Sequence, residues 1–138
     1  MTQEDKELLL QDFCARLPYG VKVLVDNKHW CDFNGRTPSE ITFDNSYRLL
    51  FLGTKLGYVK PYLFPLSSMT EEQILAFWKI EFKDNGGFEN DWDFPLYPPK
   101  VGNHFIIEAL DWLNKNHFDY RGLIEKGLAN DATGLNVY

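Results

Sequence analysis

The chain has 138 residues and a formal net charge of −6 at pH 7, and 16% of its residues are aromatic. A chain of this length can bury about 70% of the surface that its unfolded form exposes, so one globular domain over residues 1–138 is predicted. The acidic balance excludes general binding to nucleic acids or anionic membranes, which both require Lys and Arg fields. No stretch approaches the roughly 18 apolar residues of a membrane span, and the start "MTQEDKELLL" lacks the basic region of a secretory signal. A cytoplasmic location is predicted.

The first predicted element is a helix from about Gln3 to Arg16. Thr2 and Asp5 form a capping-box pattern before it. Apolar residues then follow at helical spacing and predict a buried stripe: Leu9, Leu10, Phe13, Cys14 and Leu17. Pro18 and Gly20 end the helix, because the residue before a proline avoids helical geometry and glycine accepts a positive φ.

Four strands are predicted after this helix, at Val21–Val25, Glu40–Asp44, Tyr47–Leu52 and Tyr58–Lys60. Alternating apolar and polar residues indicate the second and third, which the turn formers Asp44-Asn45-Ser46 join as a hairpin. The links are too short for crossover helices, so the sheet is predicted to be antiparallel.

Two further helices follow the predicted sheet. Overlapping caps, Ser68 with Glu71 and Thr70 with Gln73, precede a helical apolar pattern that runs to Phe82. A third helix is predicted over about 103–115, with its apolar residues inward. The predicted fold class is therefore α+β: an N-terminal helix, a small antiparallel sheet of about four strands, and two main helices packed on it, with the C-terminal corner holding the third helix against the sheet.

Three segments, Leu8–Val23, Val59–Gln73 and Glu108–Ala129, carry a resemblance to a known group of proteins. Together they resemble a family of short uncharacterised proteins found in gut anaerobes and in their phages and mobile elements. The resemblance implies a cytoplasmic protein of mobile-element origin. The family has no assigned activity, so the resemblance transfers no catalytic residue.

The corner "NKNHFDYRGL" contains the candidate catalytic residues His117, Asp119 and Arg121. In the functional interpretation, Asp119 orients His117 as an acid or base and Arg121 binds an anion. In the structural interpretation, Asn114 or Asn116 takes left-handed geometry to end the third helix, and Asp119 pairs with Arg121. Both interpretations remain open from the sequence.

The weak metal-ligand candidates are His104, Glu108 and Asp111, which share one helical stripe by i, i+4 and i+7 spacing. The same stripe also fits a solvated helix face, and the chain has neither an HExxH pair nor a CxxC pair. No metal and no cofactor is therefore predicted. The two cysteines, Cys14 and Cys31, are expected to be free thiols in a reducing compartment.

The segment Glu81–Phe94 carries five carboxylates, one lysine and four aromatic residues. Its tip, with Asp91, Trp92, Asp93 and Phe94, is the candidate partner-binding region, since rings supply buried anchors and carboxylates attract a basic partner. The alternative is a solvated loop whose rings cover the core.

The leading functional hypothesis is a non-catalytic protein-interaction or regulatory accessory factor whose partner is another protein. A small enzyme or metal-binding protein that uses the His117 corner is one alternative. A nucleic-acid mimic is another, although it requires a regular acidic face. The sequence assigns no oligomeric state.

Overall fold

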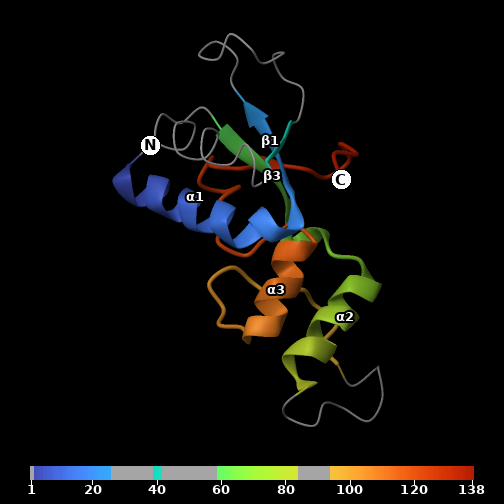
Figure 1. The fold of residues 1–138 in the computed structure, drawn as a ribbon. Helices are drawn as coiled ribbons and strands as arrows, with labels where there is room; N and C mark the ends of the chain where they lie inside the picture. Colours follow the sequence, from blue (N-terminus) through green and yellow to red (C-terminus); the bar gives the residue numbers. More distant parts are fainter. Residues whose placement is uncertain (1, 26–38, 42–58, 84–93) are drawn as a thin grey trace.

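The computed structural model describes residues 2–25, 39–41, 59–83 and 94–138. The predicted α+β class is confirmed: an N-terminal helix, a mixed sheet and two further helices (Figure 1). The helices are α1 (Gln3–Arg16), α2 (Glu71–Glu81) and α3 (Ile107–Lys115), with short 3₁₀ turns η1 (Leu17–Tyr19) and η4 (Leu66–Ser68). The strands are β1 (Val21–Val25), β2 (Ser39–Ile41), β3 (Val59–Pro65), β4 (Phe118–Asp119) and β5 (Asn130–Asp131). The predicted strand at 47–52 and its hairpin turn lie outside the described residues.

Helix α1 has the predicted bounds and the predicted capping box. Thr2 Oγ1 accepts a hydrogen bond from the Asp5 amide, and the Asp5 carboxylate accepts one from the Thr2 amide, which lowers the pKa of Asp5. The buried stripe differs from the prediction, because Leu10 and the free thiol of Cys14 are exposed. The buried positions of α1 are Leu9, Asp12, Phe13 and Arg16. Two charged residues therefore face the protein interior, while Cys31 lies outside the described residues.

The sheet has the strand order β2-β1-β3-β4, and β5 also pairs with β3. Strand β1 is antiparallel to both neighbours, with Val21 opposite Ile41 and Val23 opposite Pro61. The two short strands β4 and β5 instead pair with β3 in parallel. The parallel pairs arise because α2 and α3 carry the chain between β3 and β4, a crossover that parallel pairing requires. The sheet is thus mixed, with its β1–β3 core antiparallel as predicted.

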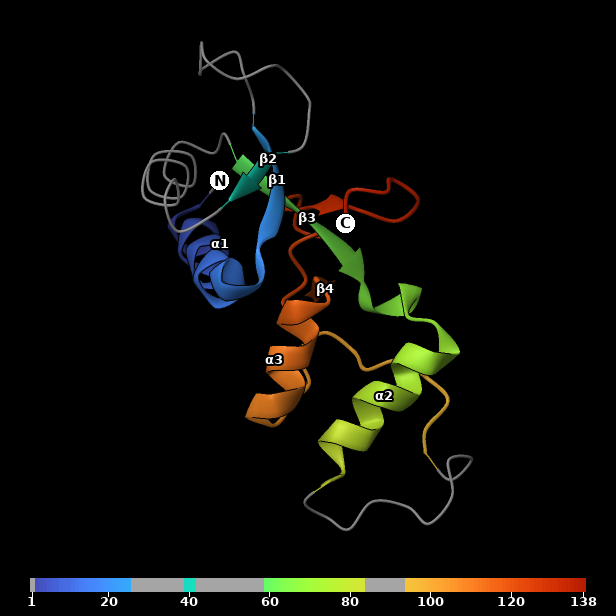
Figure 2. The same ribbon diagram turned by 45° about the vertical axis from the view of Figure 1, so that its right-hand side comes forward.

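Strand β3 lies between two hydrophobic clusters. Leu63 packs with residues of α1, β1 and the tail, whereas Phe64 packs against the cluster formed by α2 and α3. Successive side chains of a strand point to opposite faces, so one strand serves both clusters. Rings dominate the second cluster: Phe77 contacts Phe105 edge-on, and Trp112 stacks on Phe118. Figure 2 shows α2 and α3 side by side at one end of the sheet.

Helix α3 begins at Ile107, four residues after its predicted start. The Ile106 backbone is extended, and its amide donates a 3.2 Å hydrogen bond to the Glu81 carboxylate. That bond ties the chain to the end of α2 before α3 begins. At its other end α3 is held against the sheet as predicted, because the Phe64 amide donates a 2.8 Å hydrogen bond to the His117 carbonyl.

Tyr138 joins β1 to β3 through its hydroxyl group. Lys22 and Tyr62 lie next to Val23 and Pro61, the pair at which the run of opposite residues in β1 and β3 ends. The Tyr138 Oη atom accepts a hydrogen bond from the Lys22 amide at 2.9 Å and donates one to the Tyr62 carbonyl at 2.8 Å. Its ring stacks on His117 with the centroids 3.6 Å apart. A side chain from the tail thus completes the hydrogen bonding between the two strands.

Replacing Tyr138 with Phe should lower the free energy of unfolding by about 1 to 2 kcal/mol, because the change removes both hydrogen bonds of the hydroxyl group. The ring stacking would be kept. Urea denaturation measures the change, and Tyr19→Phe, at an exposed tyrosine, is the matched control. Equal stabilities of the two variants would contradict the bridging role of the hydroxyl.

Candidate functional site

The candidate corner begins with an ionic cluster that connects it to α1. Asp12 and Arg16 have no exposed side-chain surface, and Arg16 Nε lies 2.8 Å from Asp12 Oδ2. Arg121 Nη1 lies 2.8 Å from the other oxygen, Asp12 Oδ1. One carboxylate is therefore held between two guanidinium groups. The predicted ion pair between Arg121 and Asp119 is wrong, because the Arg121 guanidinium binds the Asp12 carboxylate instead.

Further contacts extend this cluster to α3. Arg16 Nη2 donates a 2.6 Å hydrogen bond to the Phe118 carbonyl. The Tyr120 ring lies against both guanidinium groups, with the Arg121 Cζ atom 4.5 Å from its centroid and that of Arg16 at 5.5 Å. The Tyr120 hydroxyl donates to Asn114 Oδ1 at 3.0 Å. Helix α1, the corner and α3 thus share one polar network.

Asp119 organises the turn that follows β4. Its side chain is 4% exposed, and its two oxygens accept hydrogen bonds from the Leu123 and Ile124 amides, each at 2.9 Å. Gly122, with a φ of 77°, allows the chain to reverse between the carboxylate and these amides. Asp119 therefore acts as a local cap for backbone donors, as aspartate commonly does in turns.

His117 ends α3 in place of the two asparagines that were predicted to do so. Its φ is 63°, in the left-handed region that non-glycine residues seldom adopt. Asn114 is buried within the helix, and Asn116 has a φ of −96°. The contacts described for Asp119 and Arg121 give both a structural role, and the His117 ring is stacked on Tyr138. The corner geometry thus favours the structural interpretation of all three residues.

The three metal candidates do not share a helical stripe. His104 precedes the first residue of α3, so its predicted i, i+4 relation to Glu108 on one helix is wrong. Glu108 Oε1 accepts a 2.9 Å hydrogen bond from Lys83 Nζ, which lowers the pKa of that carboxyl. Within residues 2–25, 39–41, 59–83 and 94–138, no group of three or more His, Cys, Asp or Glu side chains is placed to hold a metal ion.

One of the four partner-binding candidates, Phe94, belongs to the hydrophobic core. Phe94 is 7% exposed and its ring lies 6.4 Å from that of Phe82, so it is not the exposed anchor that was predicted. Asp91, Trp92 and Asp93 lie outside the described residues. By contrast, two large apolar residues shortly after Phe94 are exposed: Leu96 by 84% and Tyr97 by 60%.

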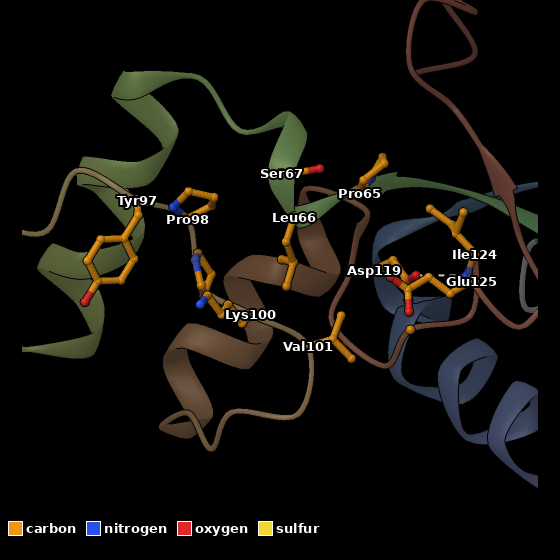
Figure 3. Close-up of a pocket in the computed structure, with 12 residues that line it drawn as sticks. Pro65, Leu66, Ser67, Tyr97, Pro98, Lys100, Val101, Asp119, Ile124 and Glu125 are labelled. Atoms are coloured by element: carbon orange, nitrogen blue, oxygen red, sulfur yellow. Dashed lines mark hydrogen bonds between the residues drawn. The ribbon is translucent and has the colours of Figure 1, made fainter.

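A cleft of about 400 Å³ lies between the end of β3, residues 97–101 and the Asp119 corner (Figure 3). Figure 3 shows Asp119 and Glu125 at one end, Lys100 and Tyr97 toward the other, and apolar side chains between them. The apolar lining consists of Pro65, Leu66, Pro98, Pro99, Val101 and Ile124. The cleft is therefore a mainly apolar channel with charged groups at separate ends.

The wall formed by residues 97–101 is anchored to the body of the protein. Trp78 Nε1 donates a 2.8 Å hydrogen bond to the Tyr97 carbonyl, and the Asn103 amide donates one to the Lys100 carbonyl. Val101 approaches the corner so closely that a Cβ atom on Gly122 would lie 3.1 Å from Val101 Cγ1. Sequence reasoning missed this wall, because its two prolines indicate an irregular segment but not what it packs against.

The fold and the cleft define a small α+β protein with an anchored, proline-lined groove. Comparison of this chain with protein-family models, curated proteins and solved structures finds no match. Among the helices of the described ranges, none is both long enough and apolar enough to span a membrane.

Replacing Arg16 with Met should lower the free energy of unfolding by about 3 to 5 kcal/mol, because the change leaves Asp12 charged and buried beside one remaining guanidinium. Lys83→Met breaks an ion pair whose side chains are 44% and 55% exposed, and should cost much less, because water screens exposed charges. Guanidinium denaturation of both variants measures the contrast. Similar small losses would contradict the structural importance of the buried cluster.

Proposed function

We propose that this chain is a non-catalytic, cytoplasmic protein-interaction module that serves another protein as an accessory or regulatory factor. Support comes first from the residues between α2 and α3. Four large apolar side chains on residues 96–107 are exposed by 48% to 84%: Leu96, Tyr97, Val101 and Ile107. Apolar side chains gathered on one segment of a protein surface are typical of a site that another protein covers.

The anchoring of this segment also supports a binding role. The chain is tied to α2 at Tyr97 through Trp78 and at Ile106 through Glu81. A segment that is already ordered loses little conformational entropy when a partner binds, so more of the contact energy appears as affinity. We name residues 96–107 the exposed segment.

The net charge of the chain supports a basic partner. The contacts made by the corner residues support a non-catalytic role. The chain's net charge of −6 favours encounter with a positively charged protein surface. Asp119 and Arg121, two of the three candidate catalytic side chains, are bonded to groups that hold the fold together. The resemblance to proteins of gut anaerobes and mobile elements is compatible with an accessory factor encoded by such an element.

The experiment is affinity capture of a partner by the tagged full chain from the organism that makes it. Leu96→Ser and Ile107→Ser should each reduce the recovered partner by at least about tenfold, since truncating an interface anchor removes much of the binding energy. Leu135→Ser, which alters a leucine that is 53% exposed in the tail, is the matched control and should retain the partner.

Circular dichroism should show that all three variants remain folded. A partner recovered equally by wild type and both segment variants would contradict the exposed segment as the interface. The absence of any specific partner, with quantitative recovery of the tagged chain, would contradict the proposed function itself.

A further inference from the structure

We propose that the cleft, one wall of which is formed by residues 97–101 of the exposed segment, binds an extended stretch of the partner in which a Lys or Arg residue adjoins an apolar residue. The basic group would lie against Asp119 and Glu125, and the apolar side chain would lie between Leu66 and Val101. This inference rests on the proposed function and adds to it the chemistry of the partner.

The acidic end of the cleft favours a cation. Asp119 is 4% exposed and accepts two backbone amides, and no Lys or Arg side chain in the described parts of the chain forms an ion pair with it. Each carboxylate oxygen can accept a further hydrogen bond. Glu125, exposed beside it, adds a second carboxylate at the same end (Figure 3). A guanidinium or ammonium group placed here would gain two charged acceptors, one of them largely removed from water.

The middle of the cleft favours an apolar side chain rather than an added strand. Its walls include Pro65, Pro98 and Pro99, which have no backbone N–H to donate. Recognition by strand pairing is therefore blocked along these walls. Leu66 and Val101 face the same space and provide an apolar surface that a partner side chain would cover.

The opposite end of the cleft sets the direction of the bound segment. Lys100 lies there with Tyr97, whose side chain is 60% exposed. A partner cation would be repelled by Lys100 and attracted by the two carboxylates, so the basic residue is confined to the Asp119 end. The volume of about 400 Å³ lies in the range of sites that hold small ligands, and is suited to a few side chains rather than a folded domain.

The test is selection of a random peptide display library on the immobilised full chain, followed by fluorescence anisotropy with the most enriched peptide. Enriched sequences should share a Lys or Arg next to a large apolar residue. Glu125→Gln should weaken binding roughly fivefold, and Val101→Asp by at least about tenfold. Glu4→Gln, at an exposed carboxylate on α1, is the matched control and should bind like wild type. Both cleft variants change exposed residues, so they test the site without removing Asp119 from the core.

Three outcomes would overturn the inference. The first is enrichment of peptides without the basic and apolar pair, or of no peptide at all. The second is unchanged affinity in Glu125→Gln and Val101→Asp. The third is equal competition by free agmatine at the peptide's own concentration, which would identify a small cation rather than a peptide as the occupant.

The partner captured by the full chain separates this inference from the proposed function. Glu125 lines the cleft but lies outside the exposed segment. A partner that is lost with Leu96→Ser and Ile107→Ser, yet retained by Glu125→Gln, leaves the interaction module intact and rejects the cleft as its peptide site. Failure to capture any partner rejects the proposed function, whatever the peptide selection finds.

Discussion

The buried carboxylate of Asp12 is the interaction on which the arrangement of the corner depends. It binds Arg16 within α1 and Arg121 across 109 residues of sequence. Arg16 in turn donates a hydrogen bond to the carbonyl of Phe118 in β4, the strand that pairs with β3 in parallel. A buried ion pair contributes little net stability over an apolar substitute, but breaking it is costly, so such a cluster specifies one arrangement of the elements that it joins. In this protein the Asp12 cluster fixes the position of α1 relative to the corner. The corner in turn forms one end of the cleft.

Local features of this fold could be predicted from the sequence, and long-range ones could not. The bounds of α1 and the Thr70–Gln73 cap of α2 follow from residues three or four positions apart. The partnership of Asp12 with Arg121 requires knowledge of the packing. One signal was present, since Asp12 and Arg16 lie three and seven positions after Leu9, on the buried stripe of a helix. Charged residues on such a stripe indicate a buried pair, although not its third member.

The start of α3 and the parallel strands illustrate the same limit. Periodicity extends the helix back to Asn103, but the bond from the Ile106 amide to Glu81 keeps that backbone extended. The pairing of β4 and β5 with β3 involves two residues each, too few to produce an alternating pattern. For the candidate corner, sequence reasoning paired Arg121 with Asp119, whereas the structure pairs Arg121 with Asp12. The cleft was missed because its three walls come from segments far apart in the chain.

The contacts of Asp119 and Arg121 give the corner a structural role, and the proposed binding cleft lies beside it. Asp119 caps a turn and also lies at the acidic end of the cleft. The most direct measurement is a double-mutant cycle between Asp12→Asn and Arg121→Met, read as the free energy of unfolding in guanidinium. A coupling energy of about 1 to 3 kcal/mol is expected, which is typical of residues in one ionic network. A coupling energy near zero would contradict the claim that Arg121 belongs to the fold, and would return it to the set of candidate functional residues.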